Sequence, residues 1–335
     1  FRKNFLNCII SQTNHLKKNI KFEKDLNKKI KILTAIVLTG LVFKEYEDNF
    51  DIGMKELEIL VKDFFDKDGF PLSRSPGDLL FFAKYLIFCK EVVKDSQKYV
   101  PEFLEDIIEK SLNCIDFIKT PDHQLPLFNG ASSTKLDEIE KYLENFRSDN
   151  KKKILGGLFK LKHKNHFLII DVDKPPQKKF SKSYQSGPLS FEYYLDGIKI
   201  ISNSGFGNNI SKKAELLSRI TACQSTLTIN DTSITRFEKN EMIKKVFGNS
   251  IQNYFKSYDL ILKNENEIIG CSASNNGYEK EFGCTHRREI FIDKGKNYLK
   301  GVDHIFKAKD GYPVRYSIRF HINPKLSVVK TMSGN

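Results

Sequence analysis

Residues 189–202 read LSFEYYLDGIKIIS and contain two runs rich in β-branched and aromatic residues, Leu189–Tyr194 and Ile198–Ser202. Such side chains pack well on a pleated surface and are enriched in strands. Between the runs stands Asp196-Gly197, a pair that accepts the backbone angles of a tight turn. The segment therefore predicts two strands joined by a short turn.

The same rhythm continues through the second half of the sequence. Five further runs predict strands: His166–Asp171, Ser225–Ile229, Ile268–Ala273, Glu289–Asp293 and Val314–His321. Turn residues such as Lys294-Gly295 separate them, whereas the stiff Lys174-Pro175-Pro176 lacks the donors of a central strand. No fixed-period repeat indicates a solenoid or a propeller. Short strands divided by turns predict an all-antiparallel β-sandwich over residues 151–335.

The first half has a helical pattern instead. Apolar residues recur at three- and four-residue spacing in Lys29–Phe43, Met54–Phe65, Gly77–Val93, Glu102–Ile118 and Leu136–Phe146. One start signal combines Ser75 at an N-cap, Pro76 at the first helical position and Asp78 as the capping-box acid. Thr134 and Asp137 repeat the pattern before the last of these helices.

Helices in one half and strands in the other predict an α+β protein with two segregated domains. We place the helical domain at residues 1–150 and the β domain at residues 151–335, with the charged stretch Ser148–Lys153 as the connector. A chain of 335 residues is long enough to bury two cores. Because it begins at Phe1 and stops at Asn335 inside a predicted β region, we expect it to be truncated at both ends.

Neither a metal centre nor a membrane span is indicated. The six cysteines are scattered, without a Cys-x-x-Cys pair or the Cys/His spacing of a zinc site. We interpret them as buried small apolar residues and expect no metal and no cofactor. The apolar run Leu33–Phe43 is about half of the roughly 20 residues that a bilayer requires, so it predicts a buried helix.

The chain is strongly basic, with a net charge of +13 at pH 7. A positive surface attracts polyanions, which favours an acidic polysaccharide, a nucleic acid or an anionic lipid as partner. A solvated lysine surface without any partner is the alternative interpretation, because lysine is spread along the whole sequence.

A polar cluster stands in the segment Asn275–Arg288. It combines Tyr278, His286, Arg287 and Arg288. A histidine exchanges protons near neutral pH, a tyrosine can act as acid or base beside cations, and arginine clamps a carboxylate through two hydrogen bonds. These groups suit a uronate site, although alternation along a strand would send only some of them to one face.

The cluster is one of several motifs that, in this order, resemble the landmarks of the C-terminal β domain of the heparinase II/III family. The landmarks are Pro188–Glu192, Asn203-Ser204-Gly205, Ser218-Arg219, Ala222–Leu227, Asn230–Ser233, Gly277-Tyr278, His286-Arg287-Arg288, Gly301-Val302-Asp303 and Phe320-His321. The resemblance covers about Leu155–Pro324. In the helical half, Asp68-Gly69, Ser73–Pro76 and Leu127–Gly130 look like features of one bacterial branch.

The resemblance implies an incomplete α/α toroid before the β-sandwich and an exported protein of the periplasm or cell envelope. It also implies a carbon–oxygen lyase that cleaves an acidic, uronate-containing polysaccharide such as a glycosaminoglycan by β-elimination. That reaction requires neutralisation of the uronate carboxylate, a base for the C5 proton and an acid for the leaving oxygen. The sequence leaves open which polysaccharide is the substrate and whether the chain is oligomeric.

The resemblance also suggests which residues carry the site. We expect Tyr184, Tyr278 and His286 to be the proton carriers. We expect the substrate to be bound by Asn14, His15, Arg74, Arg219, Gln224 and Arg287, with its acidic chain held between the domains by the three arginines.

Two departures from the family pattern weaken the expectation of activity. Many members carry His and Asp where this chain has Tyr184–Gly187, so we expect no zinc there. Many also carry a histidine where this chain has Gln224, whose amide binds a carboxylate but transfers no proton. The second hypothesis is therefore a catalytically degenerate carbohydrate-binding relative. Nucleic-acid binding ranks third, because no zinc finger, RNP motif or helix-turn-helix signature supports it.

Overall fold

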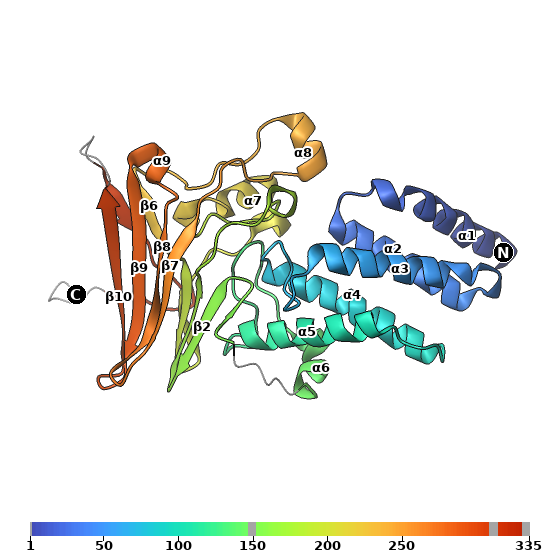
Figure 1. Cartoon of the computed structure of the whole chain (residues 1–335), viewed down its shortest axis with the longest axis horizontal. Helices are drawn as coiled ribbons and strands as arrows, with labels where there is room; N and C mark the ends of the chain where they lie inside the picture. The colour runs from blue at the N-terminus through green and yellow to red at the C-terminus, as the bar shows by residue number, and fades with distance from the viewer. Residues whose placement is uncertain (1, 147–151, 308–313, 330–335) are drawn as a thin grey trace. The chain divides into compact units, whose positions relative to one another are not determined.

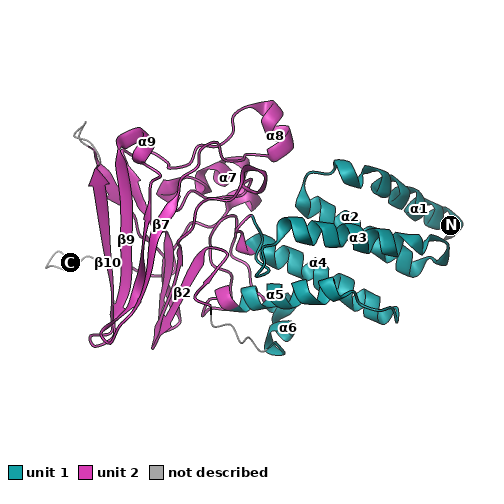
Figure 2. Ribbon diagram, in the orientation of Figure 1, with its two compact units in different colours: residues 1–72, 77–116, 137–150 teal, residues 73–76, 117–136, 151–335 magenta. Residues whose placement is uncertain are grey.

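The computed structural model describes residues 2–146, 152–307 and 314–329 (Figure 1). The chain divides into two compact units (Figure 2). Unit 1 holds residues 1–72, 77–116 and 137–150, and unit 2 holds residues 73–76, 117–136 and 151–335. Two segments of the helical half thus belong to the β unit. The predicted connector Ser148–Lys153 lies outside the described residues, apart from Lys152 and Lys153.

Unit 1 is helical. The helices of the first half are α1 (Arg2–Asn19), α2 (Leu26–Val42), α3 (Asp48–Phe64), α4 (Pro76–Asp95), α5 (Glu102–Ile118) and α6 (Glu140–Glu144). Helix α4 begins at Pro76, as its start signal predicts. The predicted helix Leu136–Phe146 is shorter and consists of a 3-10 turn followed by α6. Helix α1 was missed because it has almost no buried apolar stripe: Thr13 is the one buried side chain among its described residues.

Helices α2 and α3 approach closely at Gly40. A Cβ atom added to Gly40 would lie 2.2 Å from the backbone nitrogen of Phe50. Beside this contact, Asn49 Nδ2 donates to Thr39 Oγ1 at 3.1 Å, and Asn49 Oδ1 accepts from Lys17 Nζ at 2.6 Å. The absence of a side chain at Gly40 therefore sets the distance between the two helices.

The apolar run Leu33–Phe43 lies almost entirely within α2. Its residues Leu33, Ile36 and Val37 are buried in unit 1. Among the helices of the described residues, none has the length and apolar character needed to cross a bilayer.

Unit 2 contains antiparallel sheets. The larger sheet has the order β1-β2-β3-β4-β5-β12, the second β10-β9-β8-β7, and a small one pairs β11 with β6. The strands are β1 (Ile154–Leu155), β2 (Leu158–His163), β3 (His166–Asp171), β4 (Phe191–Leu195), β5 (Ile198–Ser202), β6 (Leu227–Ile229), β7 (Ser257–Asn264), β8 (Ile268–Asn275), β9 (Cys284–Asp293), β10 (Tyr298–Lys307), β11 (Tyr316–Ile318) and β12 (His321–Ile322). Short helices α7 (Lys212–Ser218), α8 (Glu241–Phe247) and α9 (Glu279–Phe282) lie in the connections.

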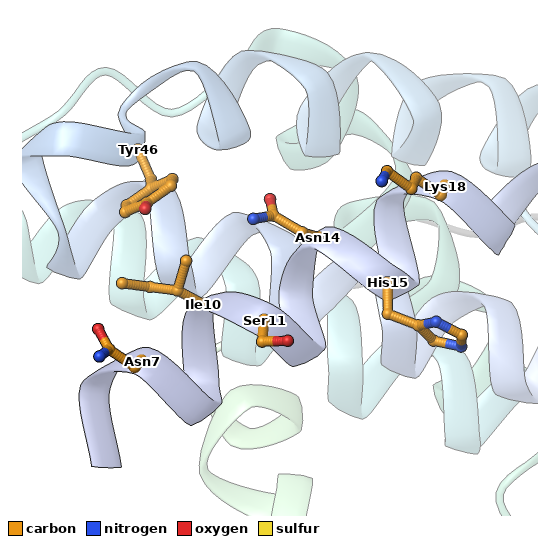
Figure 3. Close-up of a pocket in the computed structure, with 7 residues that line it drawn as sticks. All are labelled: Asn7, Ile10, Ser11, Asn14, His15, Lys18 and Tyr46. Atoms are coloured by element: carbon orange, nitrogen blue, oxygen red, sulfur yellow. The ribbon is translucent and has the colours of Figure 1, made fainter. Parts of the chain in front are cut away.

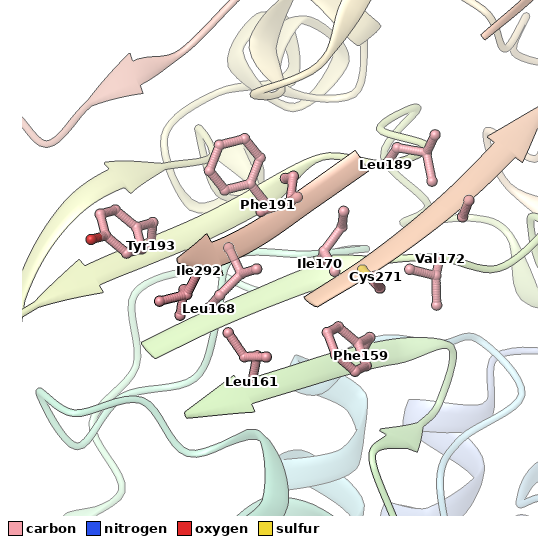
Figure 4. Packing of buried hydrophobic residues seen from close by; sticks show 12 residues of the cluster. Phe159, Leu161, Leu168, Ile170, Val172, Leu189, Phe191, Tyr193, Cys271 and Ile292 are labelled. Carbon is pink, nitrogen blue, oxygen red and sulfur yellow. The ribbon is translucent and has the colours of Figure 1, made fainter. Parts of the chain in front are cut away.

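One hydrophobic cluster joins the two larger sheets (Figure 4). Leu168 and Phe191 enter it from β3 and β4, and Cys271, Ile290 and Ile292 enter it from β8 and β9. In β9 the burial alternates strictly, as expected for a strand with one face on a core. The inward face of β9 is therefore fixed, and its other face is turned away from this core.

The hairpin predicted from residues 189–202 is confirmed as β4 and β5. The connecting residues Asp196 and Gly197 have φ values of 51° and 78°, the positive values that their residue types tolerate. Strand β4 begins two positions later than predicted. Leu189 has φ 58° and so cannot continue an extended strand.

Four strands were not predicted, namely β1, β2, β7 and β10. Strand β1 has only two residues, while β2, β7 and β10 each carry lysine beside their apolar residues, and β7 is exposed or half-buried along its whole length. Strand β9 also begins five residues earlier than predicted, because hydrogen bonds to β8 and β10 hold the polar segment Cys284–Arg288 in the sheet.

We predict that Gly40→Val lowers the free energy of unfolding of unit 1 by about 1–3 kcal/mol, because the added atoms collide with backbone of α3. The measurement is thermal or denaturant unfolding followed by the helical circular dichroism signal. Gly295→Ala is the control, since an added Cβ there meets only a side-chain oxygen of Asp293 at 3.5 Å. Equal stability of the Gly40 variant and the wild type would contradict the close approach.

Candidate functional site

A polar hollow of about 510 Å³ lies along α1 in unit 1 (Figure 3). Its lining residues are Asn7, Ile10, Ser11, Asn14, His15 and Lys18 of α1, together with Tyr46. Most of the α1 positions are spaced by three or four residues, which places them along one side of the helix. Two of the predicted substrate-binding residues, Asn14 and His15, thus line one solvent-open hollow.

The hollow offers groups for an acidic ligand and for proton transfer. Asn14 lies between Tyr46 and Lys18 in Figure 3, and its amide is exposed. The ring nitrogens of the exposed His15 imidazole lie 3.4 Å from Asn19 Nδ2, one turn further along the same helix. An ammonium group, an amide, an imidazole and a phenol can together bind a carboxylate and carry protons.

Arg74 lies in unit 2 and is buried against Asp171. Its Nη2 is 2.5 Å from Asp171 Oδ1, and Nε and Nη1 donate to the backbone carbonyls of Gly156 and Lys174 at 3.1 and 2.6 Å. Burial opposes the positive charge, but Asp171 and neighbouring groups outweigh it and raise the pKa of Arg74. Asn129 Nδ2 donates to the other Asp171 oxygen at 3.3 Å. The guanidinium is therefore fully engaged within unit 2.

Tyr184 is placed in the same buried region. Only 1% of the residue is exposed, and its hydroxyl has no hydrogen-bond partner among the described residues. Burial raises the pKa of Tyr184 strongly, and the negative charge of Asp171 adds to the effect. The phenol is therefore neutral near pH 7 and holds its proton more tightly than a free tyrosine.

Arg219 and Gln224 hold loops of unit 2 together. Arg219 is fully buried and donates to the carbonyls of Tyr184, Asn249 and Ser181 at 2.8, 2.7 and 3.0 Å. Burial lowers the pKa of Arg219 to about 10. Gln224 Nε2 donates to the Ser218 carbonyl at 2.8 Å. A substrate would have to displace these backbone partners to reach either side chain.

Gln185 meets Gln224 at the same acceptor, since its Nε2 donates to the Ser218 carbonyl at 2.9 Å. Gln185, within the stretch Tyr184–Gly187, and Gln224 thus donate to one shared backbone carbonyl. Within the described residues, no cluster of three His, Cys, Asp or Glu side chains could hold a metal ion.

Tyr278 directly precedes α9, His286 is the third residue of β9, and both side chains are buried. Tyr278 donates its hydroxyl to the Thr232 carbonyl at 2.8 Å, and burial raises the pKa of the phenol well above its ordinary value. His286 Nε2 lies 2.7 Å from Asp303 Oδ1, and His286 is 2% exposed. Burial lowers the pKa of His286, and Asp303 opposes this only in part.

Arg288 completes this buried network. Its Nε and Nη2 bind the two Asp303 oxygens at 2.8 and 3.1 Å, and its Nη1 donates to the Leu189 and Ser225 carbonyls, each at 2.8 Å. Burial alone would raise the pKa of Asp303, but hydrogen bonds from His286 and the charge of Arg288 hold it far below its ordinary value. The network ties β9 and β10 to the segments before β4 and β6.

Arg287 points to the opposite face of β9 from Arg288. Its side chain is 25% exposed, its Nε lies 3.2 Å from Glu289 Oε1, and its Nη2 donates to Ser272 Oγ at 3.1 Å. Side chains alternate between the two faces of β9, so Arg287 is separated from His286 and Arg288. The sequence left this arrangement open as an alternative to one shared site.

Several residues of these sites were not identified from the sequence. Lys18 follows Asn14 by one helical turn, so the spacing on α1 could have indicated it. Tyr46 and Asp171 come from other segments and reach their partners only through the fold, so no local pattern marks them. Asp303 belongs to the landmark Gly301-Val302-Asp303, but the sequence does not indicate its partners His286 and Arg288.

Comparison with known families explains the arrangement of unit 2. The sequence profile described as heparinase II/III-like, C-terminal, matches residues 151–335, more than half of the chain. This chain belongs to the heparinase II/III-like family. No curated protein matches the sequence.

Solved structures resemble the chain over almost its whole length. A heparinase III crystal structure has a TM-score of 0.73 at 16% identity, covering 96% of this chain and 52% of that one. A heparan sulfate lyase from Pedobacter heparinus has a TM-score of 0.65 at 17% identity, covering 96% and 51%. A further heparinase III structure has a TM-score of 0.68 at 18% identity, covering 92% of this chain and 50% of that one. The chain therefore shares the heparinase-like α+β fold and spans about half the length of these structures.

We predict that Asp171→Asn destabilises unit 2 by about 3–5 kcal/mol, because it leaves the buried Arg74 guanidinium without its countercharge. Denaturant unfolding monitored by tyrosine fluorescence measures the change. Asp106→Asn serves as the control, since Asp106 pairs with Lys110 on an exposed helix face where both side chains are about half exposed. Similar losses in the two variants would contradict a buried, charge-dependent contact.

We also predict that His286 makes the stability of unit 2 fall as the pH drops below about 6.5, the ordinary histidine pKa. Its lowered pKa means that the unfolded chain binds a proton which the folded protein excludes, so acid favours unfolding. His286→Asn should flatten the pH dependence between pH 7 and 5 by up to about 1.4 kcal/mol per pH unit. His15→Asn, at an exposed histidine of unit 1, is the control variant whose pH dependence is compared with that of His286→Asn. An unchanged slope in the His286 variant would mean that folding does not shift the pKa of His286, and the prediction would then be wrong.

Proposed function

We propose that this chain forms part of a lyase that cleaves an acidic, uronate-containing polysaccharide by β-elimination. The observation that carries the proposal is the solvent-open hollow of Asn14, His15, Lys18 and Tyr46 in a chain of the heparinase II/III-like family. The similar solved structures are described as heparinase III and heparan sulfate lyase, which supports a glycosaminoglycan as the substrate class.

The finer architecture belongs to the same proposal. We propose that α1–α6 form part of an incomplete α/α toroid and that the two larger sheets of unit 2 form a β-sandwich. A periplasmic or cell-envelope location is also proposed, by family resemblance. We propose that residues 1–150 form the helical domain and residues 151–335 the β domain. Segments 73–76 and 117–136 of the helical half belong to the compact unit 2.

The proposed reaction breaks the C5–H bond and the C4–O bond of the uronate and forms a C4=C5 double bond. Lys18 and the Asn14 amide would neutralise the carboxylate, which makes the C5 proton more acidic. His15 would take that proton, because it is an exposed group able to exchange protons near neutral pH. Tyr46, at the rim of the hollow, would return a proton to the departing glycosidic oxygen.

Tyr184, Tyr278 and His286 remain predicted proton carriers. Their burial and, for the two tyrosines, their raised pKa favour structural positions over direct contact with a polymer. Tyr184 differs from the other two, because its hydroxyl has no hydrogen-bond partner in the part of the chain that the structure describes, and the charges of Asp171 and Arg74 act on it. An unpaired buried hydroxyl costs stability, so its presence here favours a role for Tyr184 besides packing.

A second candidate function is carbohydrate binding without turnover. It is favoured by Gln224 and Gln185, whose amides hydrogen-bond to the Ser218 carbonyl and transfer no protons. On this hypothesis the acidic polysaccharide would bind, and no unsaturated product would form.

The test is the ultraviolet absorbance of the conjugated product, measured with the purified protein and a panel of uronate-containing polysaccharides. We expect an increase with at least one substrate, lowered about 100-fold or more in His15→Ala. Gln12→Ala is the matched control, because Gln12 is exposed on α1 outside the hollow. A flat trace together with measurable binding would establish the non-catalytic relative. The absence of both turnover and binding would refute both functions.

Tyr184→Phe tests the buried phenol in the same assay. Because the hydroxyl has no hydrogen-bond partner among the described residues, this variant should be at least as stable as the wild type. Loss of turnover at unchanged stability would identify Tyr184 as a proton carrier, and full turnover would remove it from the site.

A further inference from the structure

The outer face of the β10-β9-β8-β7 sheet collects charged and aromatic side chains. In β9, His286, Arg288, Ile290 and Ile292 are buried, so the alternating Arg287, Glu289 and Phe291 lie on the opposite face. In the register of β9 and β10, His304 pairs with Arg287 and Lys300 pairs with Phe291. Directly paired residues of antiparallel strands share a face. Figure 1 shows this sheet as an outer layer of unit 2.

Three basic groups of this face surround one carboxylate. Glu289 Oε1 lies 3.2 Å from Arg287 Nε and 3.6 Å from His304 Nε2, and Glu289 Oε2 lies 4.0 Å from Lys263 Nζ. The side chains of Lys263, Arg287 and His304 remain 33%, 25% and 43% exposed. One carboxylate cannot neutralise Lys263 and Arg287 together, so the cluster keeps net positive charge that solvent and ligands can reach.

Flat apolar surfaces adjoin these cations. Phe306 is 55% exposed, and its ring is stacked with that of His304, with centroids 6.0 Å apart and planes inclined by 15°. At the other end of the face, Lys300 Nζ lies 5.8 Å from the ring centroid of Phe291. We call Lys263, Arg287, Glu289, Lys300, His304 and Phe306 the outer-face patch.

We propose that the outer-face patch is a binding surface for an acidic polysaccharide, separate from the hollow on α1. Exposed aromatic rings pack against the apolar C–H faces of sugars, and arginine binds carboxylate or sulfate groups through parallel hydrogen bonds. A sheet face presents these groups along a line, which suits an extended polymer. The inference goes beyond the proposed function, because binding at this patch requires no turnover.

Glu289 is what favours a glycan over a nucleic acid. Single-stranded nucleic acids bind in grooves of nearly uniform positive potential, because a phosphate precedes every nucleotide. A carboxylate at the centre of the patch interrupts that uniform potential. It repels a phosphate and an acidic group of a glycan alike, so the preference for a glycan depends on the uncharged hydroxyls. The same carboxylate can accept hydrogen bonds from sugar hydroxyls, which are far more abundant on a polysaccharide than on DNA.

The first experiment compares two charge-matched double variants of the full chain in isothermal titration with a heparin oligosaccharide. Lys263→Gln/Arg287→Gln removes two cations from the patch. Lys62→Gln/Lys110→Gln removes two exposed cations from α3 and α5, with side chains 70% and 43% exposed. We expect the patch variant to bind about five- to tenfold more weakly and the control variant to bind like the wild type. Equal weakening in both would overturn the proposal, since the net charge alone would then govern binding.

A second pair tests the aromatic part and does not depend on the charge cluster. Phe306→Ala should weaken binding about threefold or more, whereas Tyr99→Ala, at a tyrosine of unit 1 that is 82% exposed, should not. Circular dichroism confirms that each variant is folded. No difference between Phe306→Ala and Tyr99→Ala would contradict a stacking role.

Two further probes complete the design. Neutral dextran should bind at least about tenfold more weakly than heparin, because it lacks the charged groups that the cations bind. If oligo-dT binds as tightly as heparin, and the patch variant loses affinity for both to the same extent, the ligand of the patch is a nucleic acid and the proposed glycan is wrong.

If turnover is absent but the patch variants still bind heparin more weakly, the proposed lyase function fails and this inference stands. If turnover occurs and the patch variants bind like their controls, the inference alone fails.

Discussion

The arrangement of strands in unit 2 depends on supplying hydrogen-bond acceptors to one buried cation, Arg288. Removing a guanidinium from water is costly unless each donor finds an acceptor, so its partners must hold fixed positions. Asp303 on β10 supplies two of them, and the carbonyls of Leu189 and Ser225 supply the others. These partners come from distant parts of the chain. One side chain therefore fixes the four-stranded sheet relative to the segments that lead into β4 and β6.

Arg74 and Arg219 follow the same principle in the irregular segments of unit 2. Arg74 holds the positions around Gly156 and Lys174 and is balanced by Asp171, while Arg219 is bound by three backbone carbonyls. Loops without ladder hydrogen bonds leave carbonyl groups unsatisfied, and buried guanidinium groups supply the missing donors. Arginines that resemble substrate clamps in the sequence thus stabilise the loops in this fold.

The groups left open to ligands lie elsewhere. The hollow on α1 combines an imidazole, an amide, an ammonium and a phenol, whereas the outer-face patch combines cations with aromatic rings. The first set can carry protons, and the second is suited to holding a polymer. A chain that degrades or binds a long acidic polysaccharide benefits from both, because attachment at a second place raises the effective concentration of the polymer.

The sequence by itself determined what depends on neighbouring residues: the hairpin around Asp196-Gly197, strands β3 and β5, and the start of α4 at Pro76. Turn angles, alternation and caps are local properties. The tertiary structure decided that Arg219 is buried, that Asp303 pairs with Arg288, and that β7 and β10 are strands despite their lysines. Burial and ion pairing require partners distant in sequence, and strand pairing overrides a weak local preference, so no local pattern could reveal them.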